Sequence, residues 1–154
     1  MNSNRRVVLE IFAVLIIIVI LTSFFFFRFH KIKVSVRNNT RKGKVAEIQK
    51  ALLFYKNEHG HFPISEQGKC ITKDGEIGEK LASLSAIRRI AGDPIWPKEK
   101  PTKLNEDRTP KEEAFNFCYW YVSPAGKNYY LSYYLQPEQE KDTKQGVITI
   151  SNKN

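Results

Sequence analysis

The stretch VVLEIFAVLIIIVILTSFFFF, residues 7–27, decides the fold of this chain. It runs for 21 residues with one charged side chain, Glu10, and contains neither Gly nor Pro. Because an α-helix rises about 1.5 Å per residue, this stretch spans roughly 30 Å, the thickness of bilayer hydrocarbon. A signal peptide would have a shorter apolar region and a small-residue cleavage site, whereas Arg28-Phe29-His30-Lys31 follows here. We therefore expect a retained transmembrane helix over residues 7–27, preceded by a short basic leader, residues 1–6.

Helical periodicity continues beyond this segment, which predicts an amphipathic extension of the same helix over residues 28–59. Its apolar stripe, spaced i, i+3, i+7 and i+10 with one flanking alanine, consists of Val45, Ile48, Leu52, Tyr55 and Ala51. Gly60 is the expected left-handed cap, and Pro63 follows it. One helix over residues 6–59 would be roughly 80 Å long.

The remaining residues, 60–154, predict one small globular domain that packs on residues 44–59. We expect a short helix over 79–84, an exposed loop over 98–113, and strands over 114–122, 129–135 and 147–151. In the first strand, alternation places Phe115, Phe117, Tyr119 and Tyr121 on one face, and Asn116, Cys118, Trp120 and Val122 on the other. The second strand groups Tyr129, Leu131, Tyr133 and Leu135. An antiparallel three-stranded sheet laid across the long helix covers both apolar surfaces, so the expected fold class is α+β.

Three segments resemble type IV pilins and type II secretion pseudopilins. The first is the basic leader with Val8-Leu9-Glu10 and the apolar helix. The second is Ile48-Gln49-Lys50-Ala51-Leu52-Leu53-Phe54-Tyr55 with the exit Glu58-His59-Gly60-His61-Phe62-Pro63, and the third is Asp93-Pro94-Ile95-Trp96-Pro97. The resemblance covers most of the chain. It implies a pilin-like fold and a membrane-anchored filament subunit that associates with itself or with other pilin-like subunits.

The resemblance also implies roles for Glu10, Arg5 and Arg6 in assembly. In that family, a glutamate at the fifth mature position neutralises the N-terminal amine of a neighbouring subunit, which would make Arg6 the first mature residue. Arg5 then stands before the cleavage site, where the family has Gly, and the first glycine of this chain is Gly43. The alternative is therefore an unprocessed single-pass membrane protein whose exported domain binds a partner.

The formal net charge of +9 is concentrated just after the apolar segment, between residues 28 and 44. Seven basic residues occur there without an acidic one: Arg28, Lys31, Lys33, Arg37, Arg41, Lys42 and Lys44. We expect attraction to anionic lipid, at roughly 1 kcal/mol per charge near the surface. DNA is a second candidate partner, for a DNA-uptake pilin, but no aromatic residues for base stacking interleave the run after Phe29.

The two cysteines, Cys70 and Cys118, match no metal or redox motif. In an exported domain they would form a disulfide, the alternative being two buried thiols. Counting basic residues alone would place the domain in the cytoplasm. The cysteines and the family resemblance favour the opposite topology, with the N-terminus cytoplasmic and the domain outside the cell.

Other candidate sites are weaker, and we predict no enzyme, cofactor or metal centre. His59-Gly60-His61 has metal-chelating spacing, but no third ligand lies nearby in the sequence. Some pseudopilins hold calcium near the C-terminus, yet Glu138, Glu140 and Asp142 lack a spaced calcium-loop pattern. Asn38-Asn39-Thr40 fits the N-glycosylation pattern. The sequence shows no nucleophile elbow, phosphate loop or catalytic acid pair.

Overall fold

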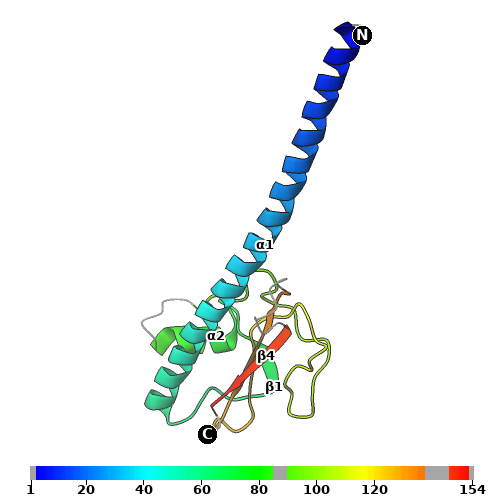
Figure 1. Ribbon diagram of the computed structural model, residues 1–154. Coiled ribbons are helices and arrows are strands. Elements are labelled where there is room, and N and C mark those ends of the chain that lie inside the picture. The colour runs from blue at the N-terminus through cyan, green and yellow to red at the C-terminus, as the bar shows by residue number, and fades with distance from the viewer. Residues whose placement is uncertain (1–2, 85–89, 138–145, 153–154) are drawn as a thin grey trace.

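The structure is a computed structural model that describes residues 3–84, 90–137 and 146–152. Its elements are, in chain order, α1 (Ser3–His59), β1 (Ser65–Cys70), α2 (Glu76–Leu84), β2 (Trp120–Ser123), β3 (Tyr130–Leu135) and β4 (Gly146–Ser151). Figure 1 shows α1 as one long rod, whose N-terminal half stands clear of the domain and whose C-terminal half runs along it. The fold is α+β, as the sequence predicts.

Helix α1 is continuous over 57 residues, so it is roughly 85 Å long. It ends where the sequence predicts, because Gly60 takes a left-handed conformation with φ of 76°. The Gly60 N–H donates to the Lys56 carbonyl at 2.8 Å, which satisfies one of the last helical acceptors. The chain then turns back toward the sheet through Phe62, whose side chain is fully buried.

The sheet is antiparallel in the order β1-β2-β3-β4, with four strands where the sequence predicts three. The additional strand, β1, is an edge strand of mostly polar residues, and its register against β2 shifts between Ser65 and Lys69. Gly68 lies at this irregularity with φ of 77°, and a Cβ there would lie 2.3 Å from the Trp120 ring. Gly68 therefore allows β1 to pass closely over Trp120, a requirement that no local hydrophobic pattern reveals.

The predicted strand over residues 114–122 is shortened to β2, which begins at Trp120. Asn116 has a positive φ of 54°, which interrupts the extended alternation before the strand. As a result Phe115 is exposed, and Phe117 packs in a separate cluster with Cys118 and Trp120. The prediction that Phe115 and Phe117 share a face with the later tyrosines is therefore wrong.

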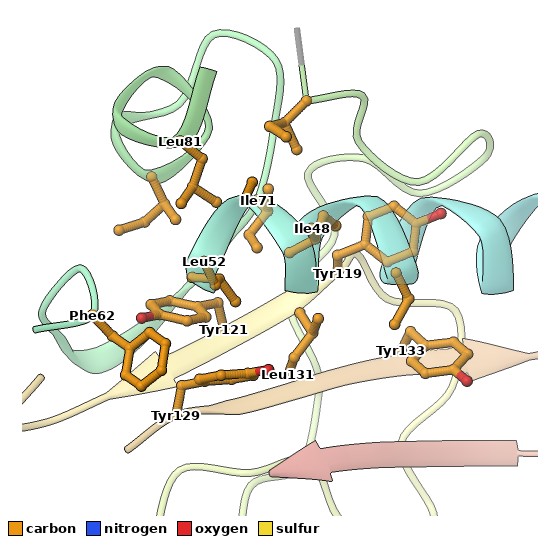
Figure 2. Close-up of a cluster of buried hydrophobic side chains, with 14 of the residues drawn as sticks. Ile48, Leu52, Phe62, Ile71, Leu81, Tyr119, Tyr121, Tyr129, Leu131 and Tyr133 are labelled. Carbon is orange, nitrogen blue, oxygen red and sulfur yellow. The ribbon is translucent and has the colours of Figure 1, made fainter. Parts of the chain in front are cut away.

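The main core lies between α1, α2 and the sheet, where the predicted stripe of α1 is buried. Figure 2 shows side chains from α1, α2 and the strands converging there, with Leu52 and Ile48 on α1 facing Tyr121 and Leu131. Members of the core from α1 are Val45, Ile48, Ala51, Leu52 and Tyr55, and those from the second and third strands include Tyr121, Leu131, Tyr133 and Leu135. Both the stripe and the predicted grouping on β3 are confirmed.

Candidate functional site along α1

The N-terminal part of α1 is an uncovered apolar helix. Val7–Phe26 has a mean hydropathy of 3.0 over 20 residues, and none of it is buried against the rest of the chain. Thr22 donates its hydroxyl to the Ile18 carbonyl at 2.8 Å and Ser23 donates to the Val19 carbonyl at 2.8 Å, so both polar groups are satisfied within the helix. This segment is long and apolar enough to span a membrane.

The three predicted assembly residues lie together at the start of α1. Glu10 follows Arg6 by four residues, one helical turn, and its side chain is exposed. Arg5 and Arg6 are helical, and their side chains lie outside the described part of the structure. A carboxylate at this position inside an apolar segment costs a few kcal/mol in lipid unless a cation compensates it.

The basic stretch after the apolar segment contains exposed cations and exposed apolar side chains side by side. Arg28 lies over the ring of Phe24, with its guanidinium carbon 5.4 Å from the ring centroid. Among the described side chains between residues 28 and 42, the exposed cationic and apolar ones are Arg28, Phe29, Ile32, Lys33, Val36, Arg37 and Lys42. Their mixture resembles the composition that suits a headgroup layer, where long cationic side chains reach the phosphates and apolar ones reach the hydrocarbon.

Arg41 departs from the rest of this predicted basic stretch, because it is completely buried. Its Nε donates to Asp93 Oδ2 at 2.6 Å and its Nη2 to Asp93 Oδ1 at 3.3 Å, in a bidentate pair. The guanidinium carbon lies 4.8 Å from the ring centroid of Trp96. Arg41 is therefore occupied inside the protein and is removed from the set of cations that could meet lipid or DNA.

Further polar contacts fix this buried pair on both sides. Asp93 Oδ1 accepts the backbone N–H groups of Ile95 at 2.9 Å and Trp96 at 3.0 Å, which folds the 93–96 segment around the carboxylate. Asn38 donates to the Gln136 carbonyl at 2.9 Å and accepts the Gln136 N–H at 3.1 Å. These bonds attach the segment before α1's main stripe to the end of β3.

The buried face of α1 therefore begins at Val34, ten residues before the predicted packing over 44–59. Apart from Ala51, which flanks Leu52, its members alternate in steps of four and three: Val34, Asn38, Arg41, Val45, Ile48, Leu52 and Tyr55. Asn38 and Arg41 fall on the same helical phase as the apolar stripe. This phase was the signal in the sequence that could have placed Arg41 inside. The charged neighbours of Arg41 in the sequence obscure this signal.

Cys70 at the end of β1 and Cys118 before β2 form a disulfide, with Cα atoms 5.6 Å apart. The predicted pairing is confirmed. The bond closes a segment with a sequence separation of 48 residues, which contains α2 and the Asp93 turn. It therefore ties the end of β1 covalently to the residues that lead into β2.

Burial and ion pairing shift several pKa values in the domain. Burial raises the pKa of the Tyr119 and Tyr121 hydroxyls well above the usual range, and the Tyr121 hydroxyl donates to the Pro63 carbonyl at 2.7 Å. Glu76 is exposed, and hydrogen bonds from Lys69 and then Lys80 lower its pKa to about 2. These groups lie in the domain, away from the apolar half of α1.

The sequence offered three other candidate sites. Asn38 has a buried side chain whose amide bonds Gln136, so its use as a glycosylation acceptor is contradicted. Glu138, Glu140 and Asp142 lie outside the described residues. Within residues 3–84, 90–137 and 146–152, no group of three or more His, Cys, Asp or Glu side chains is placed to hold a metal ion. His59 and His61 lie at the opposite end of α1 from Glu10.

Comparison of the chain with protein-family models, curated proteins and solved structures gives no match.

Proposed function

We propose that this protein is a membrane-anchored, pilin-like subunit that assembles with copies of itself or with other pilin-like subunits through α1. The observation that carries the proposal is the division of α1 into two parts. One part is apolar, membrane-length and uncovered, and the other is buried along one face by a small α+β domain. The resemblance of three sequence segments to pilins and pseudopilins also supports the proposal.

In the proposed mechanism, the apolar halves of several α1 helices pack laterally while the domains remain at the surface. Glu10 sets the axial register, because its carboxylate is stabilised by the positive N-terminal end of a neighbouring chain. The neighbouring cation is the free amine at Arg6 if the leader is removed, and an arginine side chain if it is retained. Either partner lowers the free-energy cost of placing Glu10 among apolar helices.

The proposed topology has the N-terminus in the cytoplasm and the domain outside. The disulfide between Cys70 and Cys118 supports it, because such bonds persist in oxidising compartments. The exposed cations that follow the apolar segment would then contact anionic headgroups of the outer leaflet.

Two other functions remain as alternatives. A single-pass protein that keeps its leader and binds a partner through its domain is favoured by Arg5 at the expected cleavage site. A DNA-uptake pilin is favoured by the net charge of +9, but the burial of Arg41 reduces the exposed basic surface near the membrane.

Crosslinking of subunits in native membranes tests the proposal. Glu10→Gln should leave membrane insertion and folding unchanged and should weaken or abolish crosslinked multimers, because the shape is kept and the charge is lost. Glu58→Gln makes the same change at an exposed position near the other end of α1 and should crosslink like wild type. If the chain keeps its leader and arginine is the partner, Arg6→Ala should reproduce the effect of Glu10→Gln.

Equal crosslinking of wild type and Glu10→Gln would contradict an assembly role for Glu10. Alkylation of a single cysteine introduced at Thr102, which is exposed on the domain, tests topology separately in intact cells. Labelling by a membrane-impermeant reagent is expected. Labelling only after cell lysis would place the domain in the cytoplasm.

A further inference from the structure

The C-terminal end of α1 carries two histidines that the proposed assembly does not use. His59 is the last residue of the helix, and the left-handed turn at Gly60 places His61 close to it. The ring of His59 stacks on that of Tyr55, with centroids 4.1 Å apart and planes 7° from parallel. The two imidazole centroids are 6.3 Å apart, and both residues are exposed.

Hydrogen bonds determine which nitrogen of each imidazole carries the proton. His59 Nδ1 lies 3.2 Å from the Tyr55 carbonyl oxygen, and His61 Nδ1 lies 2.8 Å from the Phe62 carbonyl oxygen. A carbonyl oxygen only accepts, so each Nδ1 must donate, which leaves the lone pair of a neutral ring on Nε2. A backbone carbonyl that holds one ring nitrogen is the arrangement that orients histidine ligands in metal sites.

The separation of the two rings is close to that of two imidazoles bound to one ion. A zinc or copper ion bonded to an imidazole nitrogen at about 2.0–2.1 Å lies roughly 3.2 Å from the ring centroid. Two rings on one ion can therefore have centroids separated by at most about 6.4 Å, and less when the angle at the metal closes. In the tetrahedral geometry that zinc adopts, the two centroids would lie about 5.2 Å apart. The observed separation is 6.3 Å, so the rings have to rotate toward each other before both Nε2 atoms can bind one ion.

The electrostatic environment at this end of α1 also favours a cation. The last carbonyl groups of a helix carry partial negative charge, and this effect acts within the final turn, where His59 lies. Glu58 precedes His59 in the sequence, and its negative charge is offset by Lys56, whose ammonium group lies over the ring of Phe62 at 4.9 Å. Imidazole nitrogen ligands select borderline transition ions over calcium or magnesium.

We propose that His59 and His61 form a two-histidine site for a divalent transition-metal ion, Zn²⁺ or Cu²⁺, at the end of α1 farthest from the apolar segment. The protein supplies two nitrogen ligands through Nε2, and water or a ligand from another molecule fills the other positions. The sequence alone offered no third ligand and no orientation for the rings. The structure adds the orientation, and the site does not depend on the proposed assembly.

Calorimetric titration of the metal-free full chain in detergent micelles with Zn²⁺ tests the site. The variants His59→Phe and His61→Phe each remove a ligand nitrogen, and His59→Phe keeps an aromatic ring to stack on Tyr55. His30→Phe makes the same change at the third histidine of the chain. Wild type and His30→Phe should bind one equivalent with equal affinity, and each of the other variants should bind about tenfold or more weakly.

Unchanged affinity in His59→Phe or His61→Phe would overturn the site, as would a loss confined to His30→Phe or the absence of Zn²⁺ binding by wild type. The Cu²⁺ electron paramagnetic resonance spectrum of wild type provides a second measurement that depends on no variant. Coupling to two imidazole nitrogens is expected, and coupling to one or none would equally overturn the proposal.

Discussion

Removing the carboxylate of Asp93, the buried partner of Arg41, should destabilise the domain far more than removing a partly exposed acidic residue of α1. The side chains of Arg41 and Asp93 are 0% and 1% exposed, so Asp93→Ala leaves a guanidinium buried without a counter-charge. Breaking a buried pair in this way costs about 3–5 kcal/mol of unfolding free energy. Asp93→Asn should cost less, because its amide oxygen can still accept the N–H groups of the 93–96 turn.

The matched control is Glu47→Ala, which removes the partner of Lys44 at 2.7 Å. The Lys44 and Glu47 side chains are 32% and 41% exposed, so water replaces the lost contact and the change should be under about 1 kcal/mol. A second control replaces both buried partners, Arg41→Met with Asp93→Leu. This double variant should be more stable than Asp93→Ala, because no charge is left unpaired.

Urea unfolding of the full chain in micelles, followed by tryptophan fluorescence, measures these differences. Trp96 lies against the Arg41 guanidinium and Trp120 is buried in the domain, so both report on the folded state. A loss below about 1 kcal/mol for Asp93→Ala, equal to that of Glu47→Ala, would refute the burial of the pair. A double variant no more stable than Asp93→Ala would show that shape, rather than the unpaired charge, causes the loss.

Three further predictions concern the stability of the domain. Leu52→Ala should lower the unfolding free energy by about 2–5 kcal/mol, because Leu52 is fully buried. Lys50→Ala should lower it by less than about 0.5 kcal/mol, because Lys50 is exposed. Equal effects in urea would mean that the buried face is assigned incorrectly. Cys118→Ser should lower the unfolding free energy by about 4 kcal/mol, because the unfolded chain is no longer closed into a loop by a bond between residues 48 apart. An unchanged urea midpoint would contradict this. Carbon-13 NMR should give Glu76 a pKa of about 2 in wild type and a pKa closer to 4.5 in Lys69→Ala. Because the pKa is lowered in the folded state, the stabilising contribution of Glu76 is complete above pH 4.5 and is lost as pH falls toward 2. A Glu76 pKa that is ordinary in wild type would contradict the ion pair.

The parts of the fold that depend on helical periodicity could be predicted from the sequence. The stripe through Leu52, the cap at Gly60 and the grouping around Leu131 on β3 all follow from spacing and from one glycine. The disulfide could be predicted because only two cysteines exist. In each case the signal lies within a short stretch of chain, so it does not need contacts between distant residues.

The missed features depend on such contacts. Strand β1 is polar, and it forms because Gly68 lets it pass over Trp120, some fifty residues later in the chain. The strand predicted before Trp120 fails at Asn116, whose positive φ no hydrophobic pattern shows. Arg41 has charged neighbours in the sequence, which obscure the match between its helical phase and the buried stripe. Its partner, Asp93, lies 52 residues away in the sequence.

The central claim is that the uncovered half of α1 is a surface for packing against other subunits. A photoreactive benzoylphenylalanine at Ile16, exposed and near the middle of the apolar segment, tests it in native membranes. The account predicts protein–protein adducts in a ladder of multimers that Glu10→Gln reduces, and few adducts when the same group replaces Thr102 on the domain. Adducts with lipid alone at Ile16 would contradict lateral assembly through α1 and would favour a single-pass protein that acts through its domain.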